Sequence, residues 1–423
     1  MRQLHYLRTA ESIIEAYKFE TPLHFFLKDY YRANRKMGST DRRTAGSLVY
    51  GYFRTKLLLE HLPMEEHLKA SWFLLHEEST PLLAVLQPEW DSKAGLAAEE
   101  KLAILEAHYG QPDPLATPDP LAPLDPLAPL DPLASLDPLA SLDPLAPLDP
   151  LKLIPFQDHL SAGIDARELA FSMLRQPHLF LRLRPEKAGE IKETLESNDI
   201  PFQEPVPLCL SLENATRAGQ VLEKFTGYFE VQDYSSQLTG RYFRPGEEES
   251  WWDACAGSGG KALLLHSLEP SVRLYMSDNR PTILHNLQQR FRAAKINNYS
   301  LLEIDLVKEK PSWEKASFDG IILDAPCSGS GTWGRSPEMM AAFKEEKIME
   351  FRRLQETLVA TLLPYLKPGS PLIYITCSVF REENEELANA VSQSGELEIE
   401  EQALLKGYQE RADTMFVARM VKK

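Results

Sequence analysis

Cysteine is scarce in this sequence, with only four among 423 residues. So few cysteines in so long a chain do not make a disulfide framework. They fit a reducing compartment, where a thiol is either catalytic or simply buried. Cys327 and Cys377 stand in distinctive motifs and are candidate reactive groups. Cys209 and Cys255 are interpreted as packing residues.

Long apolar stretches are also missing. No run reaches the ~18 apolar residues that a membrane-spanning helix needs, and residues 1–8 lack the apolar core of a signal peptide. We therefore expect a cytoplasmic protein without a membrane segment. An apolar fraction of 43% allows a sizeable core, and the length allows two or three domains.

An excess of positive charge is lacking as well, because the net charge is −16. Such a balance argues against a protein that coats nucleic acid indiscriminately. One local cluster of basic and aromatic residues nevertheless suits phosphate contact with stacking. Its members are Arg32, Arg35, Lys36, Arg42, Arg43, Arg54 and Lys56, interleaved with Tyr30, Tyr31, Tyr50, Tyr52 and Phe53. The alternative is a helical surface with buried tyrosines.

The first half of the chain divides by composition. Residues 1–110 place apolar residues three and four apart, which predicts an all-helical domain with breaks or caps at 21–22 and 38–41. Residues 111–152 repeat Asp-Pro-Leu with a period of six. Proline at this density predicts an extended linker of polyproline II character, rather than a β-solenoid of hexapeptides.

The second half contains two further segments. Residues 153–230 predict a small α+β unit, in which Arg182 and Arg184 lie on one face of a strand and either contact RNA or face solvent. Residues 231–423 alternate strands with helices, which predicts an α/β fold with a doubly wound, mainly parallel sheet. The predicted strands lie near 180–185, 200–202 and 209–212 in the first segment, and near 250–254, 272–276, 300–304, 319–323, 371–375 and 414–420 in the second.

A glycine-rich turn at 253–261 follows the first strand of the α/β segment. Such a turn lets the backbone approach a ligand at the carboxyl edge of a parallel sheet. Asp278, Asp305 and Asp324 end the next three strands. An acid after the second strand accepts ribose hydroxyls, so Asp278 suits an adenosine cofactor. A NAD-dependent dehydrogenase uses the same device, and a lone aspartate there is also a helix N-cap.

Each candidate thiol follows an apolar strand. Cys327 stands in Asp-Ala-Pro-Cys, which begins at Asp324, and Cys377 stands in Thr-Cys-Ser. We expect both thiols to face one pocket. Methylation of cytosine at carbon 5 requires such a group, because thiolate addition at carbon 6 makes carbon 5 nucleophilic. One cysteine is then the nucleophile and the other assists release.

These motifs resemble those of the Sun/Fmu (RsmB-like) family of RNA cytosine-C5 methyltransferases. Residues 38–43, 334–338 and 382–385 also match the family. The resemblance implies a Rossmann-like S-adenosylmethionine methyltransferase domain at 231–423. It also implies a NusB-like RNA-binding helical domain at 1–110.

The resemblance also implies roles for individual residues. Cys377 would be the nucleophile, Cys327 the release cysteine, and Asp324 would border both the methyl donor and the base. The implied residues for S-adenosylmethionine are Cys255, Ala256, Gly257, Ser258, Gly259, Gly260, Lys261, Asp278, Asp305 and Asp324. Ser258 replaces the family's usual proline, and Ile283 stands where many members carry an arginine. No metal site is expected, and a monomer is favoured.

Ribosomal RNA is the favoured substrate, with transfer RNA as the alternative. A DNA cytosine-C5 methyltransferase would use Cys327 for attack, but the helical domain and the second cysteine argue against it. An idle RNA-binding assembly factor has no need of both thiols and the glycine loop. A NAD-dependent dehydrogenase lacks an acid–base pair for hydride transfer in this sequence.

Overall fold

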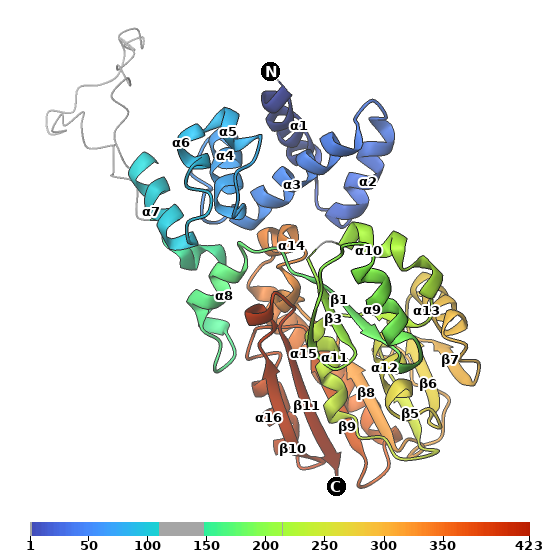
Figure 1. The fold of residues 1–423 in the computed structure, drawn as a ribbon. Helices are drawn as coiled ribbons and strands as arrows, with labels where there is room; N and C mark the ends of the chain where they lie inside the picture. Colours follow the sequence, from blue (N-terminus) through green and yellow to red (C-terminus); the bar gives the residue numbers. More distant parts are fainter. Residues whose placement is uncertain (1, 110–147, 214) are drawn as a thin grey trace, which may run out of the picture. The chain divides into compact units, whose positions relative to one another are not determined.

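The computed structural model describes residues 2–109, 148–213 and 215–423 (Figure 1). The chain divides into two compact units, Met1–Leu153 and Ile154–Lys423. Most of the predicted repeat linker, 111–152, lies outside the described residues, and Pro150–Leu153 forms one short 3-10 turn. Within the described ranges, no helix has the length and apolar character needed to cross a membrane.

The first unit is helical, as predicted. Its helices are α1 Arg2–Ala16, α2 Leu23–Ala33, α3 Ser39–Thr55, α4 Met64–Leu75, α5 Leu83–Leu86, α6 Pro88–Asp91 and α7 Ala98–Tyr109. The predicted breaks are confirmed: α2 begins directly after Pro22, and α3 begins after Gly38. The Asp41 carboxylate accepts a hydrogen bond from the Gly38 N–H at 3.2 Å, which caps the otherwise unpaired start of α3.

The basic cluster of this unit is only partly a surface. Arg32, Arg35, Lys36 and Arg43 are exposed. Arg54 is buried with 7% of its surface exposed, so its predicted place in the cluster is wrong. It lies in the last turn of α3 among buried neighbours, Phe53 and Thr55, and sequence spacing does not reveal that depth.

The second unit contains a small antiparallel sheet with the strand order β2-β3-β1-β4. Its strands are β1 Leu179–Leu183, β2 Gln203–Val206, β3 Cys209–Leu212 and β4 Phe229–Val231, accompanied by α8 Ala166–Ser172, α9 Ala188–Glu196 and α10 Ala215–Val221. The strand predicted at 200–202 begins instead at Gln203. Its position was hard to predict, because β2 is an exposed edge strand with little apolar pattern.

The prediction that Arg182 faces RNA or solvent is wrong. Its side chain is buried; Nε donates to Gln232 Oε1 at 2.7 Å and Nη1 donates to Ser267 Oγ at 2.8 Å. Arg184 is half-buried and donates to the carbonyl of Ala294. The polar face of β1 therefore packs against elements 50 or more residues away, which strand alternation alone does not show.

The large sheet has the order β10-β11-β9-β8-β5-β6-β7. Its strands are β5 Ser250–Asp253, β6 Arg273–Asp278, β7 Tyr299–Glu303, β8 Gly320–Asp324, β9 Pro371–Thr376, β10 Leu397–Leu405 and β11 Met415–Lys422. The helices of this region are α11 Tyr234–Leu238, α12 Gly260–Leu268, α13 Pro281–Ala293, α14 Pro337–Ala342, α15 Glu346–Leu362 and α16 Glu385–Gln393.

The predicted Rossmann-like, mainly parallel sheet is confirmed. Strands β9, β8, β5, β6 and β7 run parallel, whereas β11 lies antiparallel between β9 and β10. Consecutive residues face opposite layers: Trp252 packs with α15 and α16, and Trp251 packs with α12 and α13. This two-sided burial makes the parallel strands continuous apolar runs.

Candidate active site

The two candidate thiols meet at the carboxyl ends of adjacent strands. Cys327 follows β8 and Cys377 follows β9, and these strands pair in parallel with Asp324 opposite Ile375. The Sγ atoms of the two cysteines lie 3.3 Å apart. The backbone N–H of Cys377 also points at the sulfur of Cys327, at 3.4 Å. The two motifs therefore bring their thiols side by side.

Backbone contacts frame the pair. The Gly331 N–H donates to the carbonyl of Cys377 at 2.9 Å, and the Thr414 N–H donates to the carbonyl of Gly331 at 2.9 Å. A Cβ atom at position 331 would lie 1.9 Å from the Thr414 carbonyl oxygen. Only glycine therefore fits between the thiol loop and the start of β11.

The glycine-rich loop joins β5 to α12. Gly257 and Gly259 have φ of +53° and +84°, a region that favours glycine. Ser258, the departure from the family pattern, is tied down instead: Arg290 Nη1 donates to its carbonyl at 3.0 Å and to its hydroxyl at 2.8 Å. Ile283, the second departure, is half-buried in α13. The loop thus has a defined shape without the family's proline.

Asp278 ends β6 beside this loop. Its Oδ2 accepts from the Gly257 N–H at 2.9 Å and from Arg280 Nη2 at 2.9 Å. Its Oδ1 accepts from the Arg280 N–H at 3.0 Å and from Arg280 Nε at 2.8 Å. Burial acts to raise the pKa of Asp278, but the bonds from Arg280 outweigh it and the net shift is downward. Asp278 is therefore an anion under ordinary conditions.

A buried lysine connects the loop with the thiol strand. Lys261 Nζ lies 2.9 Å from Asp324 Oδ2 and 2.9 Å from Ser236 Oγ. Asp253, at the end of β5, was not among the predicted site residues. Its Oδ2 accepts from the Ala262 N–H, while Oδ1 has no hydrogen-bond partner among the described residues. Burial and the nearby charge of Asp324 raise the pKa of Asp253 to about 8.

Two predicted cofactor residues, Asp305 and Cys255, have no recorded hydrogen bond to Asp278 or Lys261. Asp305 follows β7, where its carboxylate accepts from the Val307 N–H and pairs with Lys308 Nζ at 2.9 Å. It shares the carboxyl edge of the sheet, since Asp278 pairs with Glu303 two residues earlier. Cys255 is half-buried and packs against the core, and burial raises the pKa of its thiol.

A half-buried ionic cluster supports the loop after Cys327. Arg335 Nε donates to Asp413 at 2.8 Å, and its Nη2 donates to Asp233 at 2.7 Å. Burial and the charge of Asp233 raise the pKa of Asp413, although Arg335 opposes that rise. Of these three residues, only Arg335 lies in a motif noted in the sequence, residues 334–338.

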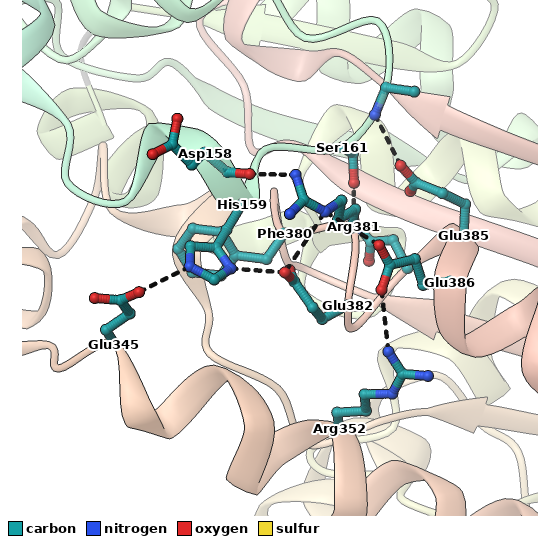
Figure 2. Close-up of polar contacts among 12 residues, drawn as sticks. Asp158, His159, Ser161, Glu345, Arg352, Phe380, Arg381, Glu382, Glu385 and Glu386 are labelled. Atoms are coloured by element: carbon teal, nitrogen blue, oxygen red, sulfur yellow. Dashed lines mark hydrogen bonds and ion pairs between the residues drawn. The ribbon is translucent and has the colours of Figure 1, made fainter.

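Figure 2 shows the contacts that residues 158–162 make with the segment after Cys377. His159 stands between two carboxylates, with Nδ1 2.6 Å from Glu382 Oε1 and Nε2 3.0 Å from Glu345 Oε1. A neutral imidazole has only one N–H, so donation to both carboxylates requires the protonated ring. Partial burial acts to lower the pKa of His159, but these two hydrogen bonds outweigh it and raise it.

Further contacts join the same two segments. The Ala162 N–H donates to Glu385 at 2.7 Å, and the Arg381 guanidinium donates to the carbonyl of Asp158 (Figure 2). Within the second segment, Arg381 Nε donates to Glu386 at 3.1 Å. Residues 158–162 therefore act as a strap across 381–386.

Comparisons with known proteins show what the region that carries this site is similar to. The family model described as 16S rRNA methyltransferase RsmB/F matches residues 241–420. Residues 241–420 thus match the RsmB/F methyltransferase family, and we call them the RsmB/F domain. The RsmB/F domain thus includes the glycine loop, Asp278, Asp324 and both thiols.

Curated relatives carry a related name. Ribosomal RNA small subunit methyltransferase B of Shewanella oneidensis is 34% identical over 164 residues, which cover 39% of this chain and 38% of that protein. The probable ribosomal RNA small subunit methyltransferase B of Bacillus subtilis is 30% identical over 171 residues, covering 40% and 38%. The chain therefore spans less than half of the length of these relatives.

Solved structures share the fold of the RsmB/F domain. The crystal structure of PH0851 covers 100% of this chain and 99% of its own, with a TM-score of 0.69 at 18% identity. The structure of NSun6 from Pyrococcus horikoshii with SFG covers 61% of this chain and 95% of its own, with a TM-score of 0.52 at 18% identity. At such identities the similarity describes architecture alone.

Proposed function

We propose that this protein is an S-adenosylmethionine-dependent RNA cytosine-C5 methyltransferase, with ribosomal RNA as the favoured substrate. The observation that carries the proposal is the pair of thiols 3.3 Å apart at the ends of adjacent strands. A single nucleophile needs no second thiol at that distance. A reaction that forms a covalent base adduct and then breaks it has a use for both.

The residues at the carboxyl edge fit S-adenosylmethionine. At Gly260 a Cβ atom would make only an ordinary contact, 3.9 Å from Gln232 Nε2. An ionised Asp278 at the end of the second strand suits a ribose diol. Residues 255–261, Asp278, Asp305 and Asp324 would hold the cofactor, which supplies an electrophilic methyl group when bound.

In the proposed reaction, the Cys377 thiolate adds to carbon 6 of a cytosine and the electron pair of the 5,6 double bond makes carbon 5 nucleophilic. Asp324 would border the base at this stage. Once carbon 5 carries the methyl group, its proton leaves and the bond between sulfur and carbon 6 breaks, which restores the double bond. The contact with Cys377 and burial raise the pKa of Cys327. Cys327 is therefore a proton-bearing thiol, suited to assisting release.

The target cytosine must leave its stack to reach a thiol, so the proposed substrate is a flipped or single-stranded base. We further propose that residues 1–110 are a NusB-like RNA-binding unit. Exposed Arg32, Arg35, Lys36 and Arg43 support that role, since guanidinium and ammonium groups contact phosphates without reading sequence.

The test is methyl transfer from labelled S-adenosylmethionine to separated small-subunit ribosomal RNA and transfer RNA, with nucleoside analysis. We expect 5-methylcytosine in ribosomal RNA with the wild type and none with Cys377→Ser. Cys327→Ala is expected to attack but to accumulate a covalent RNA adduct, visible as a slow band on a denaturing gel. Cys209→Ser is the matched control, because that thiol is fully buried in β3.

Each outcome is informative. Product in transfer RNA alone would replace the substrate but keep the chemistry. An adduct with Cys377→Ser instead of Cys327→Ala would reverse the two roles. Measurable cofactor binding without transfer to either RNA, or to small-subunit particles, would favour a binding factor over an enzyme.

A further inference from the structure

We infer that Glu383 is the positioning residue that sets the separation of the two thiols; its catalytic meaning rests on the proposed function. Glu383 has 0% of its surface exposed and lies six residues after Cys377. It does not contact either sulfur through a hydrogen bond that the structure records. Its role is therefore to act through the two loops that carry them.

One carboxylate joins both loops. The Ser328 N–H, directly after Cys327, donates to Glu383 Oε2 at 2.9 Å. The Ser378 hydroxyl, directly after Cys377, donates to Glu383 Oε1 at 2.6 Å. Each thiol is thus one residue away from a group bound to the same side chain. A shift of Glu383 moves both loops, and loss of its charge releases them from each other.

Further groups hold Glu383 by its carboxylate and by its backbone. Gln355 Nε2, from α15, donates to Glu383 Oε2 at 3.0 Å, and the Tyr374 hydroxyl donates to the Glu383 carbonyl at 2.6 Å. Because α15 and β9 belong to the packed core of the RsmB/F domain, Glu383 is fixed against rigid elements. The anchor is therefore tied to the core by α15 and β9.

Serine hydroxyls extend the connection between the loops. Ser328 Oγ donates to Ser378 Oγ at 3.1 Å, and the Val379 N–H donates to Ser330 Oγ at 2.9 Å. The Ser378 hydroxyl passes this chain on to Glu383 by donating its own proton. All recorded donors to the carboxylate are neutral, so the buried anion is held by hydrogen bonds alone.

The charge of Glu383 also acts on the release thiol. Burial raises the pKa of Glu383, and the bonds from Ser328 and Ser378 oppose that rise. As an anion, Glu383 adds to the rise in the pKa of Cys327 that the Cys377 contact and burial begin. It thereby favours the protonated form of Cys327, the form that the release step requires.

The neighbours of Glu383 face the opposite way. Glu382 and Glu385 bind the outer strap through His159 and the Ala162 N–H (Figure 2). Glu383 alone of these three acids receives donors from the thiol loops. This difference provides a matched control within one short motif.

The test compares full-length Glu383→Gln with Glu385→Gln. An amide at position 383 keeps the shape of the side chain but presents N–H groups to donors, so one loop contact is lost. Diamide probes the thiol separation in two steps: one thiolate adds to the diazene, and the other thiol then displaces this adduct, which leaves a disulfide and a hydrazine. Loss of the Glu383 charge favours the first step, so the rate of the second step is the readout. Peptide mapping then quantifies the bond between Cys327 and Cys377 over time.

We expect Glu385→Gln to match the wild type. Glu383→Gln should form the disulfide at least about tenfold more slowly, because the effective concentration of one thiol near the other falls. Its kcat for methyl transfer should fall by about 10²-fold, with the KM for S-adenosylmethionine unchanged, as for reacting groups displaced by about 1 Å.

A wild-type rate of disulfide formation in folded Glu383→Gln would overturn the inference. If that variant does not fold, as judged by circular dichroism, Ser378→Ala removes one of the loop contacts and should slow the disulfide in the same direction; an unchanged rate there also overturns it. The disulfide assay needs no RNA. Failure of the wild type to methylate RNA would therefore count against the proposed function and leave the positioning result standing.

Discussion

Replacing Arg280 by methionine should strengthen binding of the adenosine cofactor. A carboxylate has about four acceptor positions, and Asp278 uses four in this structure: one for Gly257 and three for Arg280. A ribose diol therefore competes with the Arg280 side chain. Removing the guanidinium frees two of these positions, while the backbone N–H of residue 280 keeps its bond.

The magnitude follows from the exposure of the pair. The Arg280 side chain is 59% exposed and that of Asp278 is 4% exposed, so solvent screens much of the attraction. Partly exposed pairs contribute up to about 1 kcal/mol. The cofactor must break this ion pair in order to bind Asp278, and the variant has no such pair to break. The difference corresponds to about fivefold tighter binding, since about 1.4 kcal/mol is tenfold in affinity.

Isothermal titration with S-adenosylhomocysteine provides the assay, because this ligand carries no sulfonium charge. Arg292→Met is the matched control: Arg280 precedes α13 as its N-cap, and Arg292 carries the same charge at an exposed position in the last turn of that helix. The Kd should fall for Arg280→Met and stay constant for Arg292→Met. Weaker binding by Arg280→Met would refute the reasoning and make Arg280 a ligand of the cofactor rather than a competitor for Asp278.

Two further predictions concern stability. Gly331→Ala should lower the free energy of unfolding by about 1–3 kcal/mol or more, because its Cβ meets the Thr414 backbone, which cannot rotate away. Gly189→Ala, where a Cβ in α9 meets nothing within 4 Å, should instead add about 0.5–1 kcal/mol; equal shifts in thermal unfolding would contradict this. The pKa of His159 is raised above its ordinary 6.5, so its stabilisation is complete below pH 6.5 and is lost as the pH rises through the raised value. Urea unfolding of wild type and His159→Gln at pH 6 and pH 8.5 checks this: the variant should be the less stable at pH 6, with the difference shrinking at pH 8.5.

The parallel strands were predictable because burial on both faces leaves a continuous apolar run in the sequence, as in Gly320–Asp324. Strand Leu397–Leu405 was missed for the opposite reason. It is the edge of the sheet, and its glutamates are exposed, so it has neither an apolar run nor clean alternation. Buried strands are therefore easier to predict from this sequence than exposed ones.

The site divides in a similar way. Short motifs at strand ends predicted that Cys327 and Cys377 would meet, because adjacent parallel strands end at one edge. The contacts of Glu383, Arg280 and Asp413 were not predictable. Each depends on which distant side chains converge, and neither spacing nor composition records that convergence.

The position of β11 between β9 and β10 has a consequence for the order in which the protein matures. The edge that we propose for the cofactor is built from β5, β6 and β7, which are consecutive along the chain and make local contacts that form early. The thiol frame instead joins residue 331 to residue 414. During synthesis, Cys377 therefore acquires its final surroundings only after residues 407–422 have emerged, long after the glycine-rich loop has had the opportunity to fold.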